Sequence, residues 1–277
     1  DCQMIQDTIV LANKTLPSPS VTWIADHLQS SPTIDILLSD ILEGTAVAVS
    51  DGSYFEQYST AAAAWTISSK NGCEWIEGGG IVPGIKSELN SYRAELAGLL
   101  GQAVGFQCLL PVLPQTVAPP ADSLVIGCDN IRSLEKTVVS RHKVKGAWKS
   151  VDLVTQILDI WSELPFQPLA THVYGHRDER IGPLTFLESL NVRMDTLAKS
   201  IALRHLGQSQ RLPQISILGY GTITVGGNLV SSRLQRSLCD TIHQNTLIEY
   251  LADKWEIDEI VLKDSVCWTS IARARKQ

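Results

Sequence analysis

The spacing of apolar residues changes its period near residue 90, and this change constrains the fold more than any other feature of the sequence. Before it, the segments TAVAVSDGSY, TAAAAWTISSK and CEWIEGGGIVP indicate three strands. The Asn71-Gly72 pair between the last two is a strong hairpin signal. After it, SELNSYRAELAGLLGQAVGFQCLL places apolar residues at helical spacing. Three strands joined by short turns and followed by a long helix predict an antiparallel meander.

The later strands alternate with helices. SLVIGCDN and LATHVYGH indicate strands, whereas IRSLEKTVV, SVDLVTQILDIWSEL and LNVRMDTLAKSIALRHL indicate helices. Strands separated by helices pair in parallel. The predicted fold class is therefore α/β, with a mixed five-stranded sheet, three antiparallel strands and then parallel ones, flanked by helices. Ligands of such sheets bind outside the carboxyl ends of the strands.

Three regions are predicted along the chain. Residues 1–44 indicate a helical lead-in, residues 45–206 contain the strands and helices described above, and residues 207–277 indicate a hairpin and helical extension. The chain begins with Asp1 instead of methionine. We therefore expect a fragment or a processed part of a longer product.

Composition narrows the classes of protein. The chain has 277 residues, 44% hydrophobic and 19% charged, which is enough apolar surface for a core. A net charge of −6 argues against a protein that coats nucleic acid by bulk electrostatics, but not against an enzyme with a local basic patch. No apolar run is predicted to span a membrane, and no secretory signal is predicted. The six scattered cysteines form no CxxC pair, which predicts reduced thiols in an intracellular protein of the cytoplasm or nucleus.

Four single acids lie on these predicted elements, each among apolar residues. Asp51 is predicted to end the first strand and Asp129 the fourth, whereas Glu95 falls in the first turns of the first long helix and Asp195 early in the last helix. Clustered carboxylates repel one another unless a cation joins them, and oxygen ligands suit Mg²⁺ or Mn²⁺. Taken singly, each acid also has an ordinary explanation, as a turn former or as a helix first-turn acid.

The segments VAVSDGSY, SYRAELAGL, LVIGCDN and LNVRMDTLA, with VYGHRDE before the last, resemble the ribonuclease H fold. More narrowly, they resemble the type 1 ribonuclease H domains attached to reverse transcriptases of eukaryotic retroelements. The resemblance spans about residues 45–206 and covers all four acids in the family's order. It implies an endonuclease that hydrolyses the RNA strand of RNA–DNA hybrids with two Mg²⁺ ions, Mn²⁺ being an alternative. It also implies a reverse transcriptase domain in the same polyprotein as a partner, and no membrane.

The resemblance also implies a role for each site residue. Asp51 would bridge both metal ions, and Glu95 would bind one ion and contact the 2′-hydroxyl beside the scissile phosphate. Asp129 would be a ligand that also orients the attacking water, and Asp195 would complete the second metal site. His176 would assist proton transfer or product departure from a mobile loop, and its ordinary pKa near 6.5 suits that role. The alternative for His176 is a plain loop histidine.

Further residues resemble positions that touch the substrate. Polar residues beside the acids are predicted to contact backbone or sugar: Ser53, Tyr54, Asn90, Ser91, Arg93 and Asn130. The segment RHKVKGAWK lies where family members carry a basic, aromatic handle for the DNA strand, which makes Lys143, Lys145 and Trp148 candidates. The alternative is a solvated basic loop with Trp148 packed inward. His172, on the last predicted strand, is interpreted as structural.

Two other classes of function stay open. One is a catalytically silent domain of this fold that binds nucleic acid or supports a polymerase; four intact acids argue against it. The other is a transposase or integrase, which uses a different acid set, usually with a glutamate on a late helix. Glu95 on the first long helix and Asp195 on the last favour the hydrolase.

Overall fold

The structure is a computed structural model, and it describes residue 23 together with residues 27–84, 86–113, 124–139, 148–175, 182–206, 224–225, 228–229 and 234–256. Its main feature is one mixed sheet with the order β1-β4-β3-β2-β5-β6. The strands are β1 (Gln29–Ser30), β2 (Val47–Phe55), β3 (Thr60–Ser68), β4 (Trp75–Ile81), β5 (Leu124–Cys128) and β6 (Pro168–His172).

The pairing confirms the predicted fold class. Strands β2, β3 and β4 form the antiparallel meander, β5 pairs in parallel with β2, and β6 pairs in parallel with β5. The sheet has one strand more than the five predicted, because the two-residue β1 pairs antiparallel with the outer edge of β4. A strand of two residues is too short to show a period in the sequence.

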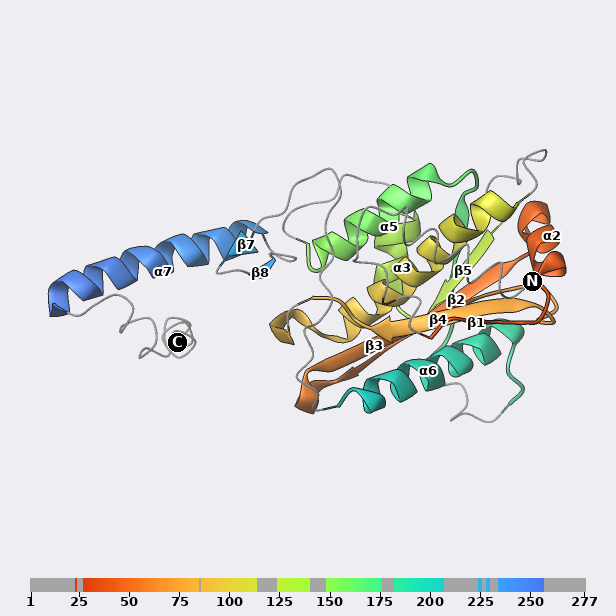
Figure 1. The fold of residues 1–277 in the computed structure, drawn as a ribbon, viewed down its shortest axis with the longest axis horizontal. Helices are drawn as coiled ribbons and strands as arrows, with labels where there is room; N and C mark the ends of the chain where they lie inside the picture. Colours follow the sequence, from red (N-terminus) through yellow and green to blue (C-terminus); the bar gives the residue numbers. More distant parts are fainter. Residues whose placement is uncertain are drawn as a thin grey trace.

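Helices cover both faces of the sheet. The helices are α2 (Asp35–Glu43), α3 (Ser91–Leu109), α4 (Ile131–Leu134), α5 (Val151–Glu163), α6 (Phe186–Arg204) and α7 (Leu234–Trp255). Short 3-10 turns cover Glu56–Tyr58, Lys86–Glu88 and Leu110–Val112, and a π-helical turn covers Glu135–Val139. Figure 1 shows α3 and α5 on one face and α6 on the other. The alanine run 61–64 of β3 is fully buried as a result, since a strand covered on both faces is apolar throughout.

Helix α3 is the central helix of the core. The predicted stripe Leu96, Leu99, Leu100, Ala103 and Phe106 is fully buried, as the helical spacing indicated. By length and composition, the helical stretch Ser91–Val112 is long and apolar enough to cross a membrane. The sequence analysis had predicted no such segment. Because 78% of its most apolar window is buried inside the protein, burial in the core accounts for its apolar character.

The predicted lead-in contributes to this core. Leu37 and Ile41 of α2 have no exposed surface, and Trp23 is 2% exposed in the same hydrophobic cluster. Part of the segment 1–44 therefore packs with the sheet. The outer limits of the domain, predicted at residues 45 and 206, stay a prediction.

Two acids lie elsewhere on their elements than the sequence suggested. Asp51 does not end its strand: β2 continues to Phe55, paired with β3 throughout. Only the parallel pairing with β5 stops before Asp51, at Val49. Asp195 lies in the middle of α6, because a capping box of Thr185 and Glu188 begins this helix at Phe186.

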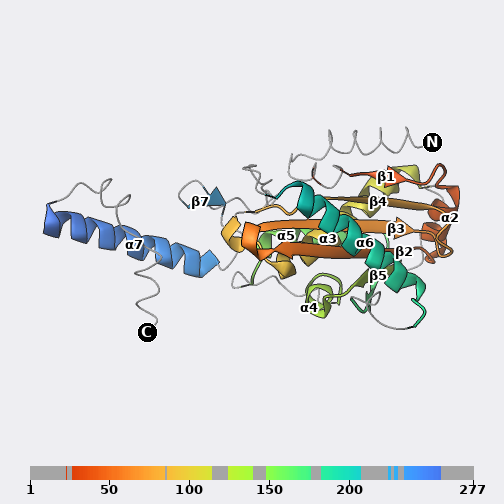
Figure 2. The ribbon, with the colours of Figure 1, turned by 90° about the horizontal axis from the view of Figure 1, so that it is seen from below.

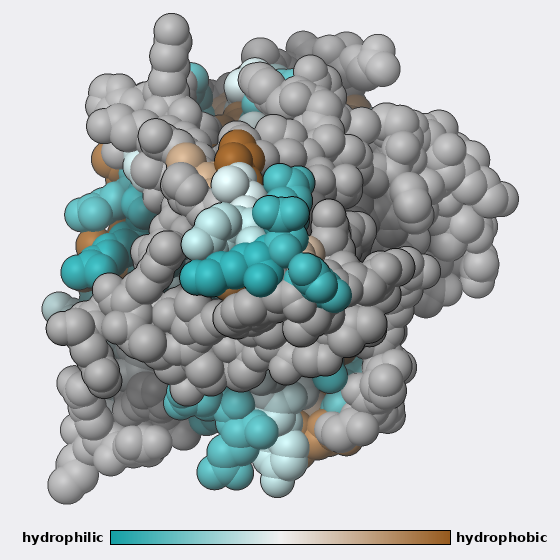
Figure 3. Space-filling view, turned by 90° about the vertical axis from the view of Figure 1, so that its left-hand side faces the viewer, coloured by the Kyte–Doolittle hydropathy of each residue, from teal (hydrophilic) through white to brown (hydrophobic). Residues whose placement is uncertain are grey.

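The C-terminal extension contains the predicted hairpin and long helix. Strands β7 (Thr224–Val225) and β8 (Asn228–Leu229) pair antiparallel and precede α7. In both ribbon views α7 extends away from the sheet (Figures 1 and 2). Figure 3 looks at the molecule from this end, and the coloured side chains there are mostly hydrophilic.

Candidate active site

Asp51 and Asp129 lie side by side because of the register between β2 and β5. Val47 pairs with Val125, and Val49 pairs with Gly127. Asp51 and Asp129 each follow two residues after the last of these pairs, so they lie next to each other. Asp129 follows the last residue of β5 directly, as predicted. Adjacent parallel strands thus bring both carboxylates to the place where β5 ends and β2 continues.

Helix α6 brings two more polar groups to Asp51. The side-chain Nδ2 of Asn191 donates a hydrogen bond of 3.0 Å to Oδ2 of Asp51, and Asp51 is only 5% exposed. Asp195 lies one helical turn after Asn191 and is close enough to raise the pKa of Asp51 by charge repulsion. Lys199, one turn further, contacts Asp195 through a 2.7 Å ion pair. One face of α6 therefore lines the site.

Glu95 reaches the same site from α3, and Gly52 makes this approach possible. A Cβ atom on Gly52 would lie 2.4 Å from the backbone carbon of Ala94 and 2.6 Å from the backbone nitrogen of Glu95. Only a residue without a side chain lets β2 and α3 approach so closely. Glu95 is 6% exposed, and its Oε2 accepts a long hydrogen bond of 3.6 Å from the Cys128 thiol.

Gly52→Ala is expected to damage the site and the fold together. The added methyl group must push β2 away from α3, which costs about 1–3 kcal/mol of stability. The displacement separates Asp51 from Glu95, and a shift of about 1 Å at a reacting centre costs on the order of 10²-fold in rate. Chemical denaturation and a cleavage assay measure the two effects.

Ser50→Ala is the matched control, because Ser50 lies on the same strand two residues earlier and its buried Oγ has no hydrogen-bond partner among the described residues. We expect this variant to keep wild-type stability and activity. Equal damage from both substitutions would mean that the close approach at Gly52 has no special role.

The pKa values of the site acids are raised because several carboxylates lie close together in a buried place. Burial, together with the charges of Asp129 and Asp195, raises the pKa of Asp51 to about 8. Burial, with Asp51 and Asp129 nearby, also raises the pKa of Glu95 well above its usual value. The Gly52 N–H favours the charged form of both groups, and Lys199 that of Asp51. These contributions are smaller than the burial and repulsion that oppose them.

The donor set fits divalent cations. Glu95 and Asp129 offer carboxylate oxygens near one another, and Asp51 interacts electrostatically with both. The side-chain Oδ1 of Asn191 is buried without a hydrogen-bond partner among the described residues. Oxygen ligands and an excess of negative charge are what Mg²⁺ and Mn²⁺ require. A cation here would also remove the repulsion between the carboxylates.

Metal-free protein is expected to lose stability as the pH rises from about 4 to about 8. The pKa of Asp51 is about 8 in the folded state against 3.8 ordinarily, so over this window the folded state keeps a proton that the unfolded state has lost. The free energy of unfolding then falls with pH, by at most about 1.4 kcal/mol per pH unit for one proton. Thermal unfolding in EDTA at pH 5 and pH 8 measures this, with Asp51→Asn as the comparison. An equal fall with pH in the two proteins would contradict the assignment.

The end of β6 supports Asp129 from its other side. His172 Nε2 lies 2.9 Å from the backbone oxygen of Asp129, which agrees with a structural role for this exposed histidine. A Cβ atom on Gly175 would lie 2.6 Å from Oδ2 of Asp129, so a side chain there would require the Asp129 carboxylate to move. His176, the predicted proton-transfer residue, lies outside the described residues, and its role stays a prediction.

Two of the predicted substrate residues beside the acids cap helices in the structure. Asn90 caps α3 by accepting from the Arg93 N–H, and Asn130 caps α4 by accepting from the Ser133 N–H. Ser91 is exposed, Tyr54 is half-buried and Ser53 is buried. A substrate role for these residues stays a prediction.

Arg93 requires a correction. The sequence predicted a substrate contact, but Arg93 has no exposed surface. Its Nη1 and Nη2 donate to the two carboxylate oxygens of Asp152 at 2.9 and 2.6 Å, and its Nε donates to the Pro83 carbonyl at 2.7 Å. These bonds tie α3 to α5 below the site. Arg93 thus fixes the helix that carries Glu95 instead of touching the substrate.

The predicted basic handle is described only in part. Lys143 and Lys145 lie outside the described residues. Trp148 is half-buried and packs against the core, and Lys136 Nζ lies 5.0 Å from the centre of its ring. The sequence analysis did not single out Lys136, whose place beside Trp148 depends on the fold.

Two further residues of the site were missed in the sequence. Asn191 precedes Asp195 by four residues, so helical spacing alone places both on one face of α6. Cys128 precedes Asp129 directly and carries its sulfur to Glu95. The first could have been found from the period of the helix, whereas the second required the position of α3.

The sequence matches no protein-family profile and no curated protein. Among solved structures, the chain is similar to the N-terminal RNase H domain of a Mycobacterium tuberculosis protein, with 15% identity, a TM-score of 0.39, and coverage of 57% of this chain and 94% of that one. It is similar to RNase H1 of Halobacterium salinarum, with 17% identity, a TM-score of 0.38, and coverage of 56% and 96%. It is also similar to LC11-RNase H1 in complex with an RNA/DNA hybrid, with 14% identity, a TM-score of 0.42, and coverage of 57% and 97%.

The antiparallel meander, the parallel pairing of β5 and β6, and the helices that flank the sheet are those expected from the sequence. The fold is ribonuclease H-like. With TM-scores below 0.5, the likenesses to solved structures carry no weight for the activity of the chain.

Proposed function

We propose that the chain is an endonuclease that hydrolyses the RNA strand of RNA–DNA hybrids with two divalent cations. The observation that carries this proposal is the convergence of the four acids, from β2, α3, the end of β5 and α6, at the carboxyl end of β5. Burial and mutual repulsion keep the pKa values of Asp51 and Glu95 high, so the cluster favours bound cations. Pairs of cations about 3.5–4 Å apart are typical of phosphoryl-transfer sites.

Different residues of the site would have different roles in the reaction. Asp51 is central, because it interacts with Glu95, Asp129 and Asp195, and is thus the residue suited to bridge two ions. Asn191 holds the Asp51 carboxylate in place through its 3.0 Å hydrogen bond. When bound, the cations supply an activated water and stabilise the departing 3′ oxygen. The carboxylates are carried by strands and helices, which limit their movement during the reaction.

The substrate class follows from the same resemblance and from general features of hybrid recognition. RNA is distinguished from DNA by its 2′-hydroxyl, which both donates and accepts hydrogen bonds. Glu95, on the α3 side of the cluster, is the carboxylate suited to contact that hydroxyl. The net charge of −6 favours recognition by shape and local contacts over bulk attraction.

The setting of the chain is part of the proposal. The likeness of residues 45–206 to domains of retroelement reverse transcriptases supports a reverse transcriptase domain in the same polyprotein as the partner. Such a partner would supply the grip on the hybrid that an acidic chain lacks. Reverse transcription takes place inside cells, so the proposed location is the cytoplasm or nucleus.

A panel of four substrates of one sequence tests the proposal: an RNA–DNA hybrid, single-stranded RNA, double-stranded RNA and double-stranded DNA, each incubated with the full chain in Mg²⁺. We expect cleavage of the RNA strand in the hybrid and of no other strand. Binding of the hybrid is measured in parallel in Ca²⁺. A chain that binds the hybrid and leaves it intact in both Mg²⁺ and Mn²⁺ would favour the catalytically silent domain. Cleavage of double-stranded DNA would favour the transposase or integrase class.

A further inference from the structure

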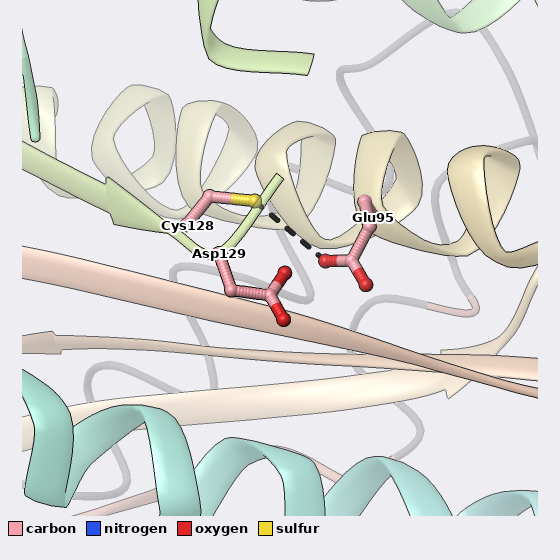
Figure 4. A group of neighbouring side chains, drawn as sticks. All are labelled: Glu95, Cys128 and Asp129. Carbon is pink, nitrogen blue, oxygen red and sulfur yellow. Dashed lines mark hydrogen bonds between the residues drawn. The ribbon is translucent and has the colours of Figure 1, made fainter. Parts of the chain in front are cut away.

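The two sides of the carboxylate cluster differ in charge. On the side of α3 and β5, the carboxylates of Glu95 and Asp129 lie side by side, with the sulfur of Cys128 next to them (Figure 4). The groups that shift the pKa of Glu95 most are carboxylates, the Cys128 side chain and a backbone N–H, and none of them is a cation. On the α6 side, by contrast, a lysine is paired with Asp195. A positive charge is therefore built into the α6 side of the cluster.

Lys199 is placed to act on both acids of that side. Its Nζ lies 2.7 Å from Oδ2 of Asp195, four residues earlier in α6. Its charge also lowers the pKa of Asp51, so its influence extends to the neighbouring carboxylate. The side chain of Asp195 is 18% exposed and that of Lys199 46% exposed. The lysine is thus the partner that has room to move into solvent.

The pair differs from an ordinary ion pair on a helix surface by the row of residues to which it belongs. Asn191, Asp195 and Lys199 follow one another at four-residue spacing along α6, so they share one face of the helix. Asn191 is buried and donates to Asp51. This face therefore lines the cluster. A half-exposed pair contributes little to stability, so a divalent cation can displace the ammonium from Asp195 at small cost.

We propose that Lys199 is a counter-cation which makes the position held by Asp51 and Asp195 the weaker of the two cation positions. A cation there has to displace the ammonium from Asp195 and remains near its positive charge. Repulsion of a divalent cation by a unit charge a few ångströms away weakens binding about tenfold. The inference rests on the two cation positions of the proposed function. It does not require cleavage of nucleic acid, and Lys199 acts through Asp195 as a positioning residue.

The test is a titration of the full chain with manganese chloride, without nucleic acid. Electron paramagnetic resonance measures the free Mn²⁺, because the sharp signal of the hydrated ion is lost on binding. We expect the wild type to bind one Mn²⁺ tightly and a second weakly. In Lys199→Met the second Kd should fall about tenfold, with a smaller change in the first. Lys199→Arg keeps the charge and should leave both values near those of the wild type.

Two further variants serve as controls. Lys254→Met makes the same change in charge and side-chain length on α7, which extends away from the sheet (Figures 1 and 2). Lys254 also lies beside an aromatic ring, with its Nζ 5.6 Å from the centre of Tyr250, and its replacement should alter neither Kd. Asp195→Asn should abolish the second binding event and leave the first.

A second Kd in Lys199→Met equal to that of the wild type would overturn the inference, as would a single bound Mn²⁺ in every variant. The same tenfold fall in Lys199→Arg would also overturn it, because side-chain shape and not charge would then set the affinity. A second event that persists in Asp195→Asn would place the weak position elsewhere and refute the assignment.

The hybrid-cleavage assay separates this inference from the proposed function. The expected Mn²⁺ constants without cleavage would leave the role of Lys199 standing and refute the endonuclease. Cleavage by a chain whose second Kd does not depend on Lys199 would refute that role and leave the endonuclease intact.

Discussion

Asp51→Asn is expected to lower the rate of hybrid cleavage about 10³-fold or more, because the loss of the central carboxylate weakens both proposed metal positions. The same change is expected to stabilise the metal-free protein at pH 8 by about 1–3 kcal/mol, because it removes a buried charge repelled by its neighbours. Asparagine keeps the shape of the side chain, and its Oδ1 can still accept the bond from Asn191. Loss of activity with gain of stability distinguishes a functional carboxylate from a structural one.

Single-turnover cleavage and thermal unfolding in EDTA measure the two effects. The matched control is Asp253→Asn, which removes one exposed acid from α7, away from the cluster. It has the same change in net charge and should alter neither quantity. An Asp51→Asn protein that is inactive and also less stable would indicate that the substitution disturbs the fold, and the metal role of Asp51 would lose its support.

Asp152→Ala is expected to have the largest effect on stability, a loss of about 3–5 kcal/mol. In the wild-type protein both partners are almost fully buried and joined by two hydrogen bonds. The substitution leaves the guanidinium of Arg93 buried with no carboxylate to balance its charge. Since these bonds tie α5 to the helix that carries Glu95, activity should also fall. Urea denaturation measures the free energy of unfolding.

The double variant Arg93→Met/Asp152→Leu is the informative comparison. Replacing both partners by apolar side chains removes the unpaired charge, so the double variant should be more stable than Asp152→Ala. It also tests the correction to Arg93. The structure predicts that the KM for the hybrid stays near the wild-type value, whereas the sequence-based substrate contact predicts that it rises.

Apart from the two-residue β1, the sheet could be predicted from the sequence because each strand carries a local signal. The Asn71-Gly72 turn marks the β3–β4 hairpin, and the change to helical spacing marks α3. The parallel pairing of the later strands followed from their alternation with helices. The acids were found because each stands alone among apolar residues, which is a local property.

The remaining features depend on contacts between distant segments. The position of Asp51 inside β2 is set by pairing with β3, which continues past the point where β5 ends. The burial of Arg93 required Asp152, 59 residues later, and the approach of Cys128 to Glu95 required the packing of α3 on the sheet. In each case a polar residue near an acid has the same local pattern whether it faces substrate or the interior, so the sequence alone does not separate the two.

The chemistry of the cleavage products tests the central proposal most directly. The full chain is incubated in Mg²⁺ with a hybrid whose RNA strand is end-labelled, beside a sample containing EDTA, and the ends of the RNA fragments are identified. Attack by a metal-activated water on the phosphodiester, with the 3′ oxygen departing, predicts fragments with 3′-hydroxyl ends that form only in Mg²⁺. Intact RNA in Mg²⁺, or fragments with 2′,3′-cyclic phosphate ends that also form in EDTA, would contradict hydrolysis by this carboxylate centre.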